Sequence, residues 1–261
     1  MVGQTVVILG GGIGGVVTAN ELRHRLGKEH RIVLVDREGT HIFWPSLLWL
    51  QVGLQEAPSF IRDLAVLQKK GIEVIKGEVA AIDPAKRVVR VNGSNLEADH
   101  LVVSLGAQLA PEQIHGLAEA GHNLYSLEGA TAIRDARRGL TQGMLVVLVA
   151  RTPFKCPAAP YEAAMLLDHD LRKRKVRHQV SVALYSPEPG PMMVAGAEVL
   201  AGVRQLVEER GIGYYPQHQV AQVDQSEQDP LVRLDADRRD RRARFAVHEE
   251  EVILESPASP V

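Results

Sequence analysis

Short apolar runs alternate along the chain with longer segments in which apolar residues recur every three or four positions. The first run, TVVILG at 5–10, is β-branched and uninterrupted, which is typical of a buried parallel strand. A helix is predicted over 13–26, where apolar residues keep a helical spacing and Gly27 is placed to end it. The run RIVLVD at 31–36 predicts a second buried strand. The chain therefore begins in the strand–helix–strand order of a parallel α/β unit.

The rest of the first half continues with a loop, a second helix and several short strands. Apolar residues at helical spacing predict the helix over 60–70. Turn signals such as Asn92-Gly93 separate the later apolar runs. The strands predicted between these turns lie at 72–75, 77–83, 87–91 and 96–106.

The second half repeats the same order of elements. Strands are predicted at 144–150 and 180–186, and helices at 158–174 and 196–210. The short strands predicted after them lie at 212–215, 219–224 and 230–234.

We therefore expect an α/β fold of two Rossmann-like βαβ units, each with a small β-meander. The first unit spans 1–107 and the second 143–261, with 108–142 as a connecting segment. The tail after residue 235 has dense mixed charge, which predicts a solvated hairpin and a frayed end. No apolar strand is expected to resume after Phe245.

Three glycines follow the first strand with the spacing G-x-G-x-x-G, at Gly10, Gly12 and Gly15. Gly10 permits a tight turn, Gly12 lets a pyrophosphate approach the backbone, and Gly15 lets helix and strand pack closely. The helix N-terminus supplies partial positive charge for the phosphates. Asp36 stands 21 residues after Gly15, where its carboxylate can accept hydrogen bonds from the adenosine ribose. The pattern predicts a dinucleotide site.

Composition narrows the class of protein without deciding its chemistry. The chain has 261 residues, of which 45% are hydrophobic and 24% charged, and its net charge of −2 gives no electrostatic reason to expect nucleic acid as a partner. A single cysteine excludes an intramolecular disulfide and a cysteine-based zinc site. The N-terminus lacks the basic region of a signal peptide, and no apolar stretch is long enough to span a bilayer. We expect a cytoplasmic protein, soluble or peripheral on the inner face of the cell membrane.

The turn after the first strand of the second unit has a different composition. Residues 151–159 contain no glycine, and Pro153, Pro157 and Pro160 each remove a backbone donor. A pyrophosphate needs those N–H groups and a close approach to the backbone. The next strand ends in Ser186 instead of an acid. We therefore predict that the second unit does not bind NAD(P).

The only cysteine, Cys156, lies in that turn, at the start of the predicted helix. Partial positive charge from the helix and the neighbouring Lys155 favour the thiolate, the nucleophilic and redox-active form. Pro157 suits the first helical position. The position alone leaves two interpretations open: a reactive thiol, or a small buried residue that fills the core.

Four segments, VILGGGIGGVVTANELR, LVVSLGA, KCPAAPYEAAMLLDHDLRKR and VSVALYSPEP, together resemble the sulfide:quinone oxidoreductase family and its flavocytochrome sulfide dehydrogenase relatives. The Cys-Pro-x-x-Pro-Tyr-Glu stretch is the most specific of these matches. The resemblance implies FAD in the first unit and a redox thiol at Cys156, which carries sulfur as a persulfide before electrons pass to FAD and then to a quinone. It implies FAD contacts at Gly10, Gly12, Gly15, Asp36, Val79 and Gly106.

The same resemblance implies parts that this sequence does not contain. Family members use a second redox cysteine in a C-terminal third, which also carries a late Gly-Asp segment and amphipathic helices that seat the enzyme on the membrane. This chain is expected to be truncated before that return segment, so a disulfide-cycling mechanism is not expected within it. In some members a further cysteine is linked to the flavin, and Tyr125 or Ser126 stands in the corresponding place here.

The leading hypothesis is an FAD-dependent oxidoreductase that passes electrons from sulfide or a related sulfur donor through Cys156 and FAD to a quinone. Two alternatives stay open: a non-catalytic FAD-binding remnant or partner subunit, and an NADH:quinone dehydrogenase. Peripheral membrane contact and a homo-oligomer are also left open.

No metal site is expected, because His169 has no second histidine at ligand spacing. The basic run LRKRKVRH at 171–178 is interpreted as a helix end that complements the helix dipole.

Overall fold

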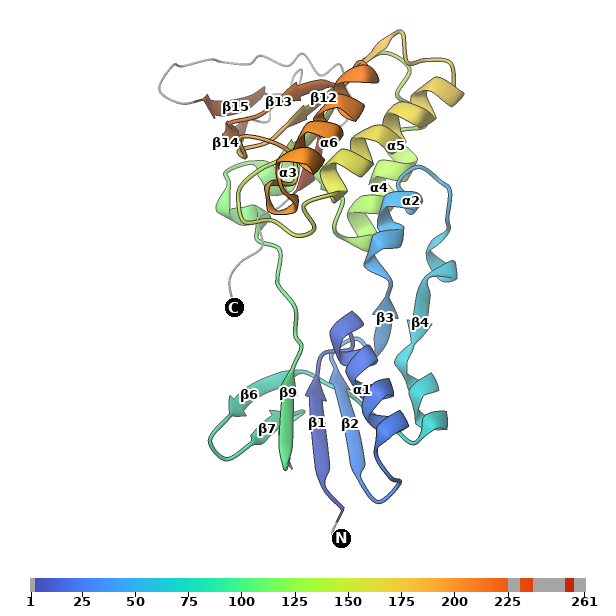
Figure 1. Cartoon of the computed structure of the whole chain (residues 1–261), viewed down its shortest axis with the longest axis vertical. Helices are drawn as coiled ribbons and strands as arrows, with labels where there is room; N and C mark the ends of the chain where they lie inside the picture. The colour runs from blue at the N-terminus through green and yellow to red at the C-terminus, as the bar shows by residue number, and fades with distance from the viewer. Residues whose placement is uncertain (1–2, 225–230, 237–251, 256–261) are drawn as a thin grey trace. The chain divides into compact units, whose positions relative to one another are not determined.

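The chain forms two compact units (Figure 1). The computed structural model describes residues 3–224, 231–236 and 252–255. Unit 1 comprises Met1–Phe43 and Pro58–Gly106, and unit 2 comprises Trp44–Ala57 and Ala107–Val261. The first unit is expected to end at residue 107, and unit 1 ends at Gly106. The segments 44–57 and 108–142, however, are both parts of unit 2.

Unit 1 is built on a four-stranded parallel sheet with the strand order β5-β2-β1-β9. Its strands are β1 (Thr5–Leu9), β2 (Arg31–Asp36), β5 (Glu73–Lys76) and β9 (His100–Val103). Helix α1 (Ile13–Arg25) connects β1 to β2. The chain moves outward from β1 to β5 and then returns to β9 on the other side of β1. The strand order therefore reverses at the carboxyl ends of β1 and β9, the point where parallel α/β sheets bind ligands.

The central strands β1 and β2 are apolar along nearly their whole length because both faces of the sheet are covered there. One cluster joins the sheet to α1 and to a 3₁₀ helix, η3 (Leu64–Lys70), and contains Val6, Ile8, Ala19, Ile32, Leu34, Leu64, Leu67 and Ile72. The other joins the sheet to the meander of β6 (Val79–Asp83), β7 (Val88–Val91) and β8 (Ser94–Glu97), and contains Val7, Leu9, Val33, Val35, Val89 and Val91. Burial of each such side chain contributes about 1.5–3 kcal/mol.

Two predicted elements of unit 1 differ in part from the structure. The predicted helix over 60–70 is helical only from Leu64 on, as the 3₁₀ helix η3, and the residues before it form a strand, β4 (Ile61–Asp63), which pairs with β3 (Thr40–Ile42). The reason is Asp63, whose carboxylate accepts a 2.7 Å hydrogen bond from Ala65 N and starts the helix there. The single strand expected over 96–106 is divided between β8 and β9, because Asp99 N donates to Thr5 O and its carboxylate accepts from Thr5 N.

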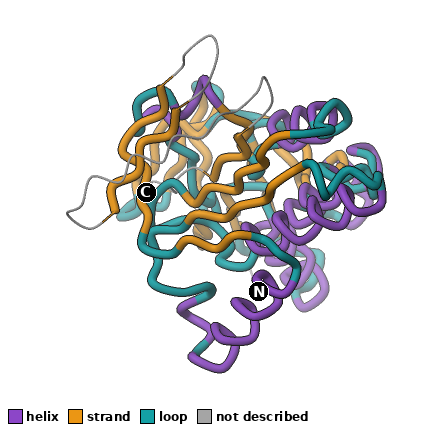
Figure 2. Tube along the Cα trace, turned by 90° about the horizontal axis from the view of Figure 1, so that it is seen from above, coloured by secondary structure: helices purple, strands orange, loops and turns teal. Residues whose placement is uncertain are grey.

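Unit 2 contains a five-stranded parallel sheet with the order β10-β16-β11-β12-β13. Its strands are β10 (Gly121–Asn123), β11 (Gly143–Val149), β12 (Val180–Tyr185), β13 (Gly213–Tyr215) and β16 (Val252–Glu255). The helices that connect them are α4 (Leu127–Ala136), α5 (Ala159–Lys173) and α6 (Ala197–Glu209). Figure 2 shows helices gathered along one flank of these strands.

Successive residues of β11 and β12 pack into different cores. Leu145, Val147 and Leu184 belong to a cluster that includes residues of α4, α5 and α6. The alternate residues Val146 and Leu148 pack on a second cluster. That cluster includes residues beside the short 3₁₀ helix η4 (Pro111–Gln113), in α3 (Leu117–Ala120) and in β14 (His218–Asp224), which pairs with β15 (Leu231–Ala236). Strands buried on both faces explain why these runs are continuously apolar.

The sequence predictions for unit 2 fail at the two segments without long apolar runs. The supposed connector 108–142 contains η4, α3, β10 and α4, and Ser126 caps α4 by accepting a 2.9 Å hydrogen bond from Gly129 N. The expectation that no strand follows Phe245 is wrong, because β16 pairs with both β10 and β11 inside the sheet. The other residues of the tail after 236 lie outside the described residues.

The segment 44–57 of unit 2 is held by arginines of α4 and its C-terminal end. It contains the 3₁₀ helix η1 (Trp44–Ser46), α2 (Leu47–Leu50) and the start of η2 (Ala57–Ser59). Arg137 donates from Nε to Gln51 O at 3.0 Å and contacts Asp170 of α5 at 2.7 Å. Arg134 pairs with Glu56 at 2.9 Å. These contacts tie α2 to α4 and α5.

In the described part of the chain, no helix is both long enough and apolar enough to cross a lipid bilayer.

Replacement of Arg137 by Gln is expected to destabilise the protein by about 2–4 kcal/mol, because it leaves the nearly buried Asp170 with only Arg174, 3.5 Å away, as a partner. Urea denaturation measures this change. The control is Arg25→Gln, which removes an exposed ion pair with Glu21 and should change stability by less than about 1 kcal/mol. Equal effects of the two substitutions would contradict a structural role for the buried pair.

Candidate functional site

The turn between β1 and α1 needs two of its glycines for the backbone itself. Gly10 has φ +101°, and a Cβ there would lie 2.2 Å from the Ser104 carbonyl oxygen. A Cβ on Gly15 would lie 1.8 Å from the carbonyl oxygen of Gly10. Any side chain at these positions would push α1 or the segment after β9 away from the turn.

Gly12 is different because its neighbourhood is open. Chain neighbours aside, no described atom lies within 4 Å of the position of a Cβ on Gly12. Gly12 is the N-cap residue of α1 with an ordinary φ of −69°, and the cap makes no side-chain hydrogen bond. The first N–H groups of α1 are thus left for a ligand, which is the arrangement that binds a pyrophosphate at a helix N-terminus. The turn fits the phosphates of a dinucleotide.

Asp36 organises the same turn from the end of β2. Its Oδ2 accepts a 2.8 Å hydrogen bond from Gly11 N, and its Oδ1 accepts from the backbone N–H groups of Glu38 and Gly39. The Nδ1 atom of His41 lies 2.9 Å from the carbonyl oxygen of Gly11, so both backbone polar groups of Gly11 have a side-chain partner. A carboxylate has about four acceptor positions, and three are used here. Asp36 therefore keeps acceptor capacity for a ribose hydroxyl.

The remaining predicted contacts lie near this edge of the sheet. Gly106 follows β9 with φ +75°, and nothing lies within 4 Å of the position of its Cβ. Val79 begins β6 two residues after Gly77, whose N–H donates to the carbonyl oxygen of Asp36 at 2.9 Å. The side chain of Val79 is half-buried against the sheet core, and Val79 pairs with Val91 of β7 at the end of the meander.

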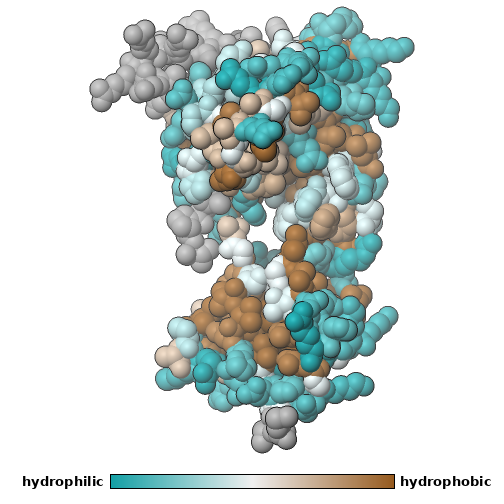
Figure 3. All heavy atoms as spheres, in the orientation of Figure 1, coloured by the Kyte–Doolittle hydropathy of each residue, from teal (hydrophilic) through white to brown (hydrophobic). Residues whose placement is uncertain are grey.

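Exposed apolar side chains border the turn of unit 1. Ile13, Val103 and Leu105 are each 45–59% exposed, and they flank the glycines of α1 and the segment after β9. Figure 3 shows apolar surface gathered on unit 1 on the face in view. Exposed apolar surface of this kind is typical of a binding site.

The corresponding turn of unit 2 presents a thiol. Cys156 is exposed, which makes the alternative interpretation as a buried filler wrong. It adopts φ +50°, a conformation that costs a non-glycine residue about 1 kcal/mol or more and is concentrated at functional sites. Helix α5 begins at Ala159, so Pro160 and not Pro157 lies in its first turn. Cys156 stands two residues before the N-cap, and its carbonyl oxygen accepts a 3.0 Å hydrogen bond from Ala159 N.

Two contacts within unit 2 hold the backbone around this thiol. The Tyr125 hydroxyl, at the end of β10, donates to the carbonyl oxygen of Lys155 and lies 3.3 Å from that of Cys156. The Lys155 ammonium lies over the indole of Trp44, 5.6 Å from the ring centre. Neither contact can be predicted from the sequence, because the partners are far apart in the chain and no spacing rule connects them.

The carboxyl edge of β12 and β13 is occupied by protein groups. Tyr161 of α5 is 1% exposed and meets the ring of Tyr214 edge-on, with ring centres 6.0 Å apart. Ser186, at the end of β12, is fully buried. Burial raises the pKa of Tyr161, of Tyr214 and of the Glu188 carboxyl above their ordinary values. A nicotinamide nucleotide would occupy this edge in a Rossmann unit. The buried tyrosines and the glycine-free turn leave no cradle for its phosphates.

A metal centre is not part of either turn. Among the residues that the structure describes, no group of three or more His, Cys, Asp or Glu side chains is arranged to hold a metal ion.

A family model described as pyridine nucleotide-disulphide oxidoreductase matches residues 4–247. The chain belongs to this family. It is 25% identical to the mitochondrial sulfide:quinone oxidoreductase of Mus musculus over 237 residues, which cover 88% of this chain and 52% of that protein. It is 26% identical over 204 residues to the alternative NAD(P)H-ubiquinone oxidoreductase C1 of Arabidopsis thaliana, with 68% and 38% of the two chains covered.

Among solved structures, the crystal structure of the sulfide:quinone oxidoreductase from the hyperthermophilic bacterium Aquifex aeolicus is similar over 99% of this chain and 59% of that chain, with a TM-score of 0.87 and 25% identity. The chain spans about half the length of the curated relatives that it matches. These similarities confirm the α/β fold of Rossmann-type flavoproteins, the resemblance to sulfide:quinone oxidoreductases and FAD as the cofactor.

The glycines of the first turn are expected to respond differently to a methyl group. Gly12→Ala should leave the stability of the FAD-free protein unchanged or raise it by about 0.5 kcal/mol, because its φ suits alanine. It should weaken FAD binding at least tenfold, because the methyl group occupies the path of the pyrophosphate. Gly15→Ala should lower stability by about 1–3 kcal/mol through its clash with Gly10. Thermal unfolding and FAD titration measure both; unchanged FAD affinity in Gly12→Ala would refute the assignment of this turn.

Stability near the edge of β12 is expected to depend on pH through Glu188. Its folded-state pKa is raised by burial, so the folded protein holds this proton more tightly than the unfolded chain and loses stability as the pH rises through that pKa. Glu188→Gln should therefore raise the free energy of unfolding at pH 8, by less than about 1 kcal/mol because the group is partly exposed, and leave it unchanged near pH 4; thermal unfolding at the two pH values measures this. The exposed Glu97→Gln serves as control and should show no such difference.

Proposed function

We propose that the chain acts as an FAD-dependent oxidoreductase of the sulfide:quinone oxidoreductase type, which passes electrons from sulfide or a related sulfur donor to a quinone. The observation that carries the proposal is the exposed, conformationally constrained Cys156 in the turn of unit 2 where a phosphate-binding loop is absent. The names of the mouse relative and of the Aquifex aeolicus structure support the same donor and acceptor.

The residues of unit 1 have the task of holding FAD. The open backbone at Gly12 and the N-terminus of α1 receive the pyrophosphate, and Asp36 offers its remaining acceptor capacity to the ribose. Gly106 and the backbone of Val79 line the same edge. When bound, FAD supplies a two-electron acceptor, which is chemistry that no side chain of this chain provides.

Cys156 has the task of binding the donor sulfur. Joining the Sγ thiolate of Cys156 to the sulfur of HS⁻ as a persulfide is a two-electron oxidation, and bound FAD would be the oxidant that takes up both electrons and one proton (RS⁻ + HS⁻ + H⁺ + FAD → RSSH + FADH⁻). The N-terminus of α5 stabilises a nearby negative charge and so favours the thiolate as nucleophile. Tyr125 holds the backbone of this turn through its hydroxyl and acts as a positioning residue. An exposed thiol is also accessible to a small anion such as hydrosulfide.

A second candidate function is that of a non-catalytic FAD-binding partner subunit. The glycine turn of unit 1 supports FAD binding by itself, whether or not the chain is catalytic. An NADH:quinone dehydrogenase has support from the Arabidopsis thaliana relative. The glycine-free turn before α5 and the buried Tyr161 argue against it.

We place the protein in the cytoplasm, with peripheral contact to the inner face of the membrane where it meets a quinone.

The decisive experiment follows flavin absorbance of the FAD-loaded chain under anaerobic conditions after addition of sulfide. The wild type should bleach, and Cys156→Ala should bleach at least about a hundredfold more slowly while it retains FAD. Tyr125→Phe should give an intermediate rate, with Tyr215→Phe, an exposed tyrosine outside this turn, as its control.

Undiminished bleaching of Cys156→Ala would overturn the role of the thiol. Bleaching by NADH would instead favour the dehydrogenase, and a wild-type flavin that neither donor reduces would favour the partner subunit.

A further inference from the structure

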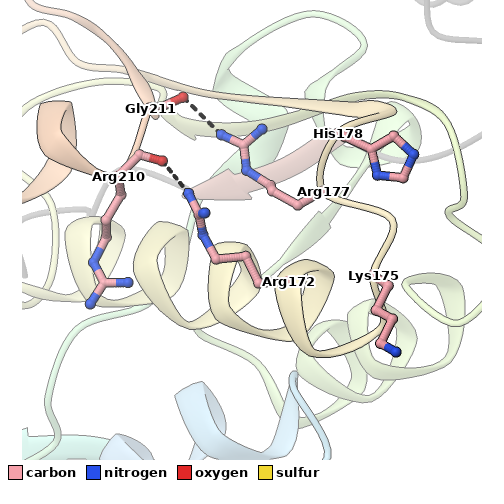
Figure 4. A pocket seen from close by; sticks show the side chains of 6 residues that line it. All are labelled: Arg172, Lys175, Arg177, His178, Arg210 and Gly211. Carbon is pink, nitrogen blue, oxygen red and sulfur yellow. Dashed lines mark hydrogen bonds between the residues drawn. The ribbon is translucent and has the colours of Figure 1, made fainter.

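A basic hollow of about 680 Å³ lies at the carboxyl ends of α5 and α6 (Figure 4). It is lined by Arg172, Lys175, Arg177, His178, Arg210 and Gly211. Helix α5 has 15 residues and begins at the thiol turn, so the hollow lies about 22 Å along the helix from Cys156. We propose that this hollow binds a phosphate-bearing anion, as a second site of unit 2 that does not depend on the function proposed for the thiol.

A buried carboxylate fixes two of the arginines. Asp168 is 0% exposed and contacts Arg172 Nε at 2.8 Å and Arg177 Nε at 2.6 Å. The same guanidinium groups donate to the carbonyl oxygens of Arg210 and Gly211, the two residues that follow α6, as the dashed lines in Figure 4 show. These contacts orient the two guanidinium groups before any ligand arrives, which reduces the entropic cost of binding.

The positive charge of this cluster exceeds what the structure neutralises. Arg210 is only 3.7 Å from Asp168, which it shares with Arg172 and Arg177. The ammonium of Lys175 has no acidic partner among the described residues, and this side chain is exposed. Four permanent cations therefore line the hollow, and the one carboxylate beside it, Asp168, pairs with three of them.

The other acidic groups nearby are already paired. Asp170 contacts Arg137 and Arg174 on the neighbouring side of α5. On α6, Glu208 pairs with Arg204 and Glu209 accepts from Gln205. Burial of one carboxylate needs one cation, and additional like charges within a few ångströms repel each other. The interpretation of the run 171–178 as a dipole-complementing helix end thus leaves Lys175 without a partner, and Arg210, which lies outside that run, has only a share of Asp168 at 3.7 Å.

The geometry favours a phosphate as the missing anion. Planar guanidinium groups pair with phosphate oxygens through parallel hydrogen bonds, and lysine adds a point charge. The volume lies within the range of about 300–1,000 Å³ that is usual for small-molecule sites and exceeds that of a single phosphate. The ligand class is therefore a phosphate ester or diphosphate, either a soluble metabolite or the headgroup of an anionic phospholipid.

To test this, the FAD-loaded chain is titrated with inorganic pyrophosphate at low salt, and calorimetry measures the heat of binding. The wild type should bind one equivalent, and Lys175→Gln and Arg210→Gln should each weaken binding about tenfold. Neither substitution should lower the melting temperature without ligand, because each removes a repulsive charge. The control is Lys69→Gln, an exposed lysine at the end of η3, which should bind as the wild type does.

A second arm distinguishes the two sources of phosphate. Flotation with vesicles of phosphatidic acid, compared with vesicles of phosphatidylcholine, should show binding that pyrophosphate displaces if the source is a lipid headgroup, and none if it is a soluble phosphate. Either result supports the site when Lys175→Gln and Arg210→Gln reduce it. Absence of both pyrophosphate and vesicle binding, or an equal loss in Lys69→Gln, would overturn the proposal.

Discussion

The carbonyl oxygen of Gly10 lies 1.8 Å from the position that a Cβ on Gly15 would take, and this close approach of α1 to β1 sets the geometry of the first site. Because no side chain separates them, the N-terminus of α1 points at the edge where the strand order reverses. Asp36 then fixes the turn through Gly11 N. The space beside Gly12 lets a charged diphosphate reach the backbone, and it exists because Gly10 and Gly15 pack so closely on their neighbours.

The two units show how one strand–turn–helix arrangement supports two kinds of chemistry. In unit 1 the turn consists of glycines and offers backbone donors to a ligand. In unit 2 the equivalent turn contains no glycine and exposes Cys156. The buried ring of Tyr161 fills the space at the first turn of α5. That turn is held by protein groups: the Tyr125 hydroxyl donates to the carbonyl oxygen of Lys155, and the Lys155 ammonium lies over the indole of Trp44. The far end of α5 carries excess positive charge, so the two ends of one helix differ in chemistry.

Sequence predicted those features that depend on local spacing. The glycine pattern, the buried strands and the exchange of glycine for cysteine could all be found from neighbouring residues. Features that depend on distant partners could not: Tyr125 reaches Cys156 across 31 positions, and β16 becomes a strand only because β10 and β11 flank it. The error at 60–70 has a local cause, because apolar spacing alone did not register the cap at Asp63. In a short segment, a capping residue predicts the start of a helix better than the spacing of apolar residues does.

The central claim is that Cys156 binds the donor sulfur, and mass spectrometry tests it most directly. The FAD-loaded chain is mixed anaerobically with one equivalent of sulfide, alkylated and digested. The peptide containing Cys156 should gain the mass of one sulfur atom in proportion to the flavin that is reduced. Full reduction of the flavin with an unmodified Cys156 peptide would contradict it.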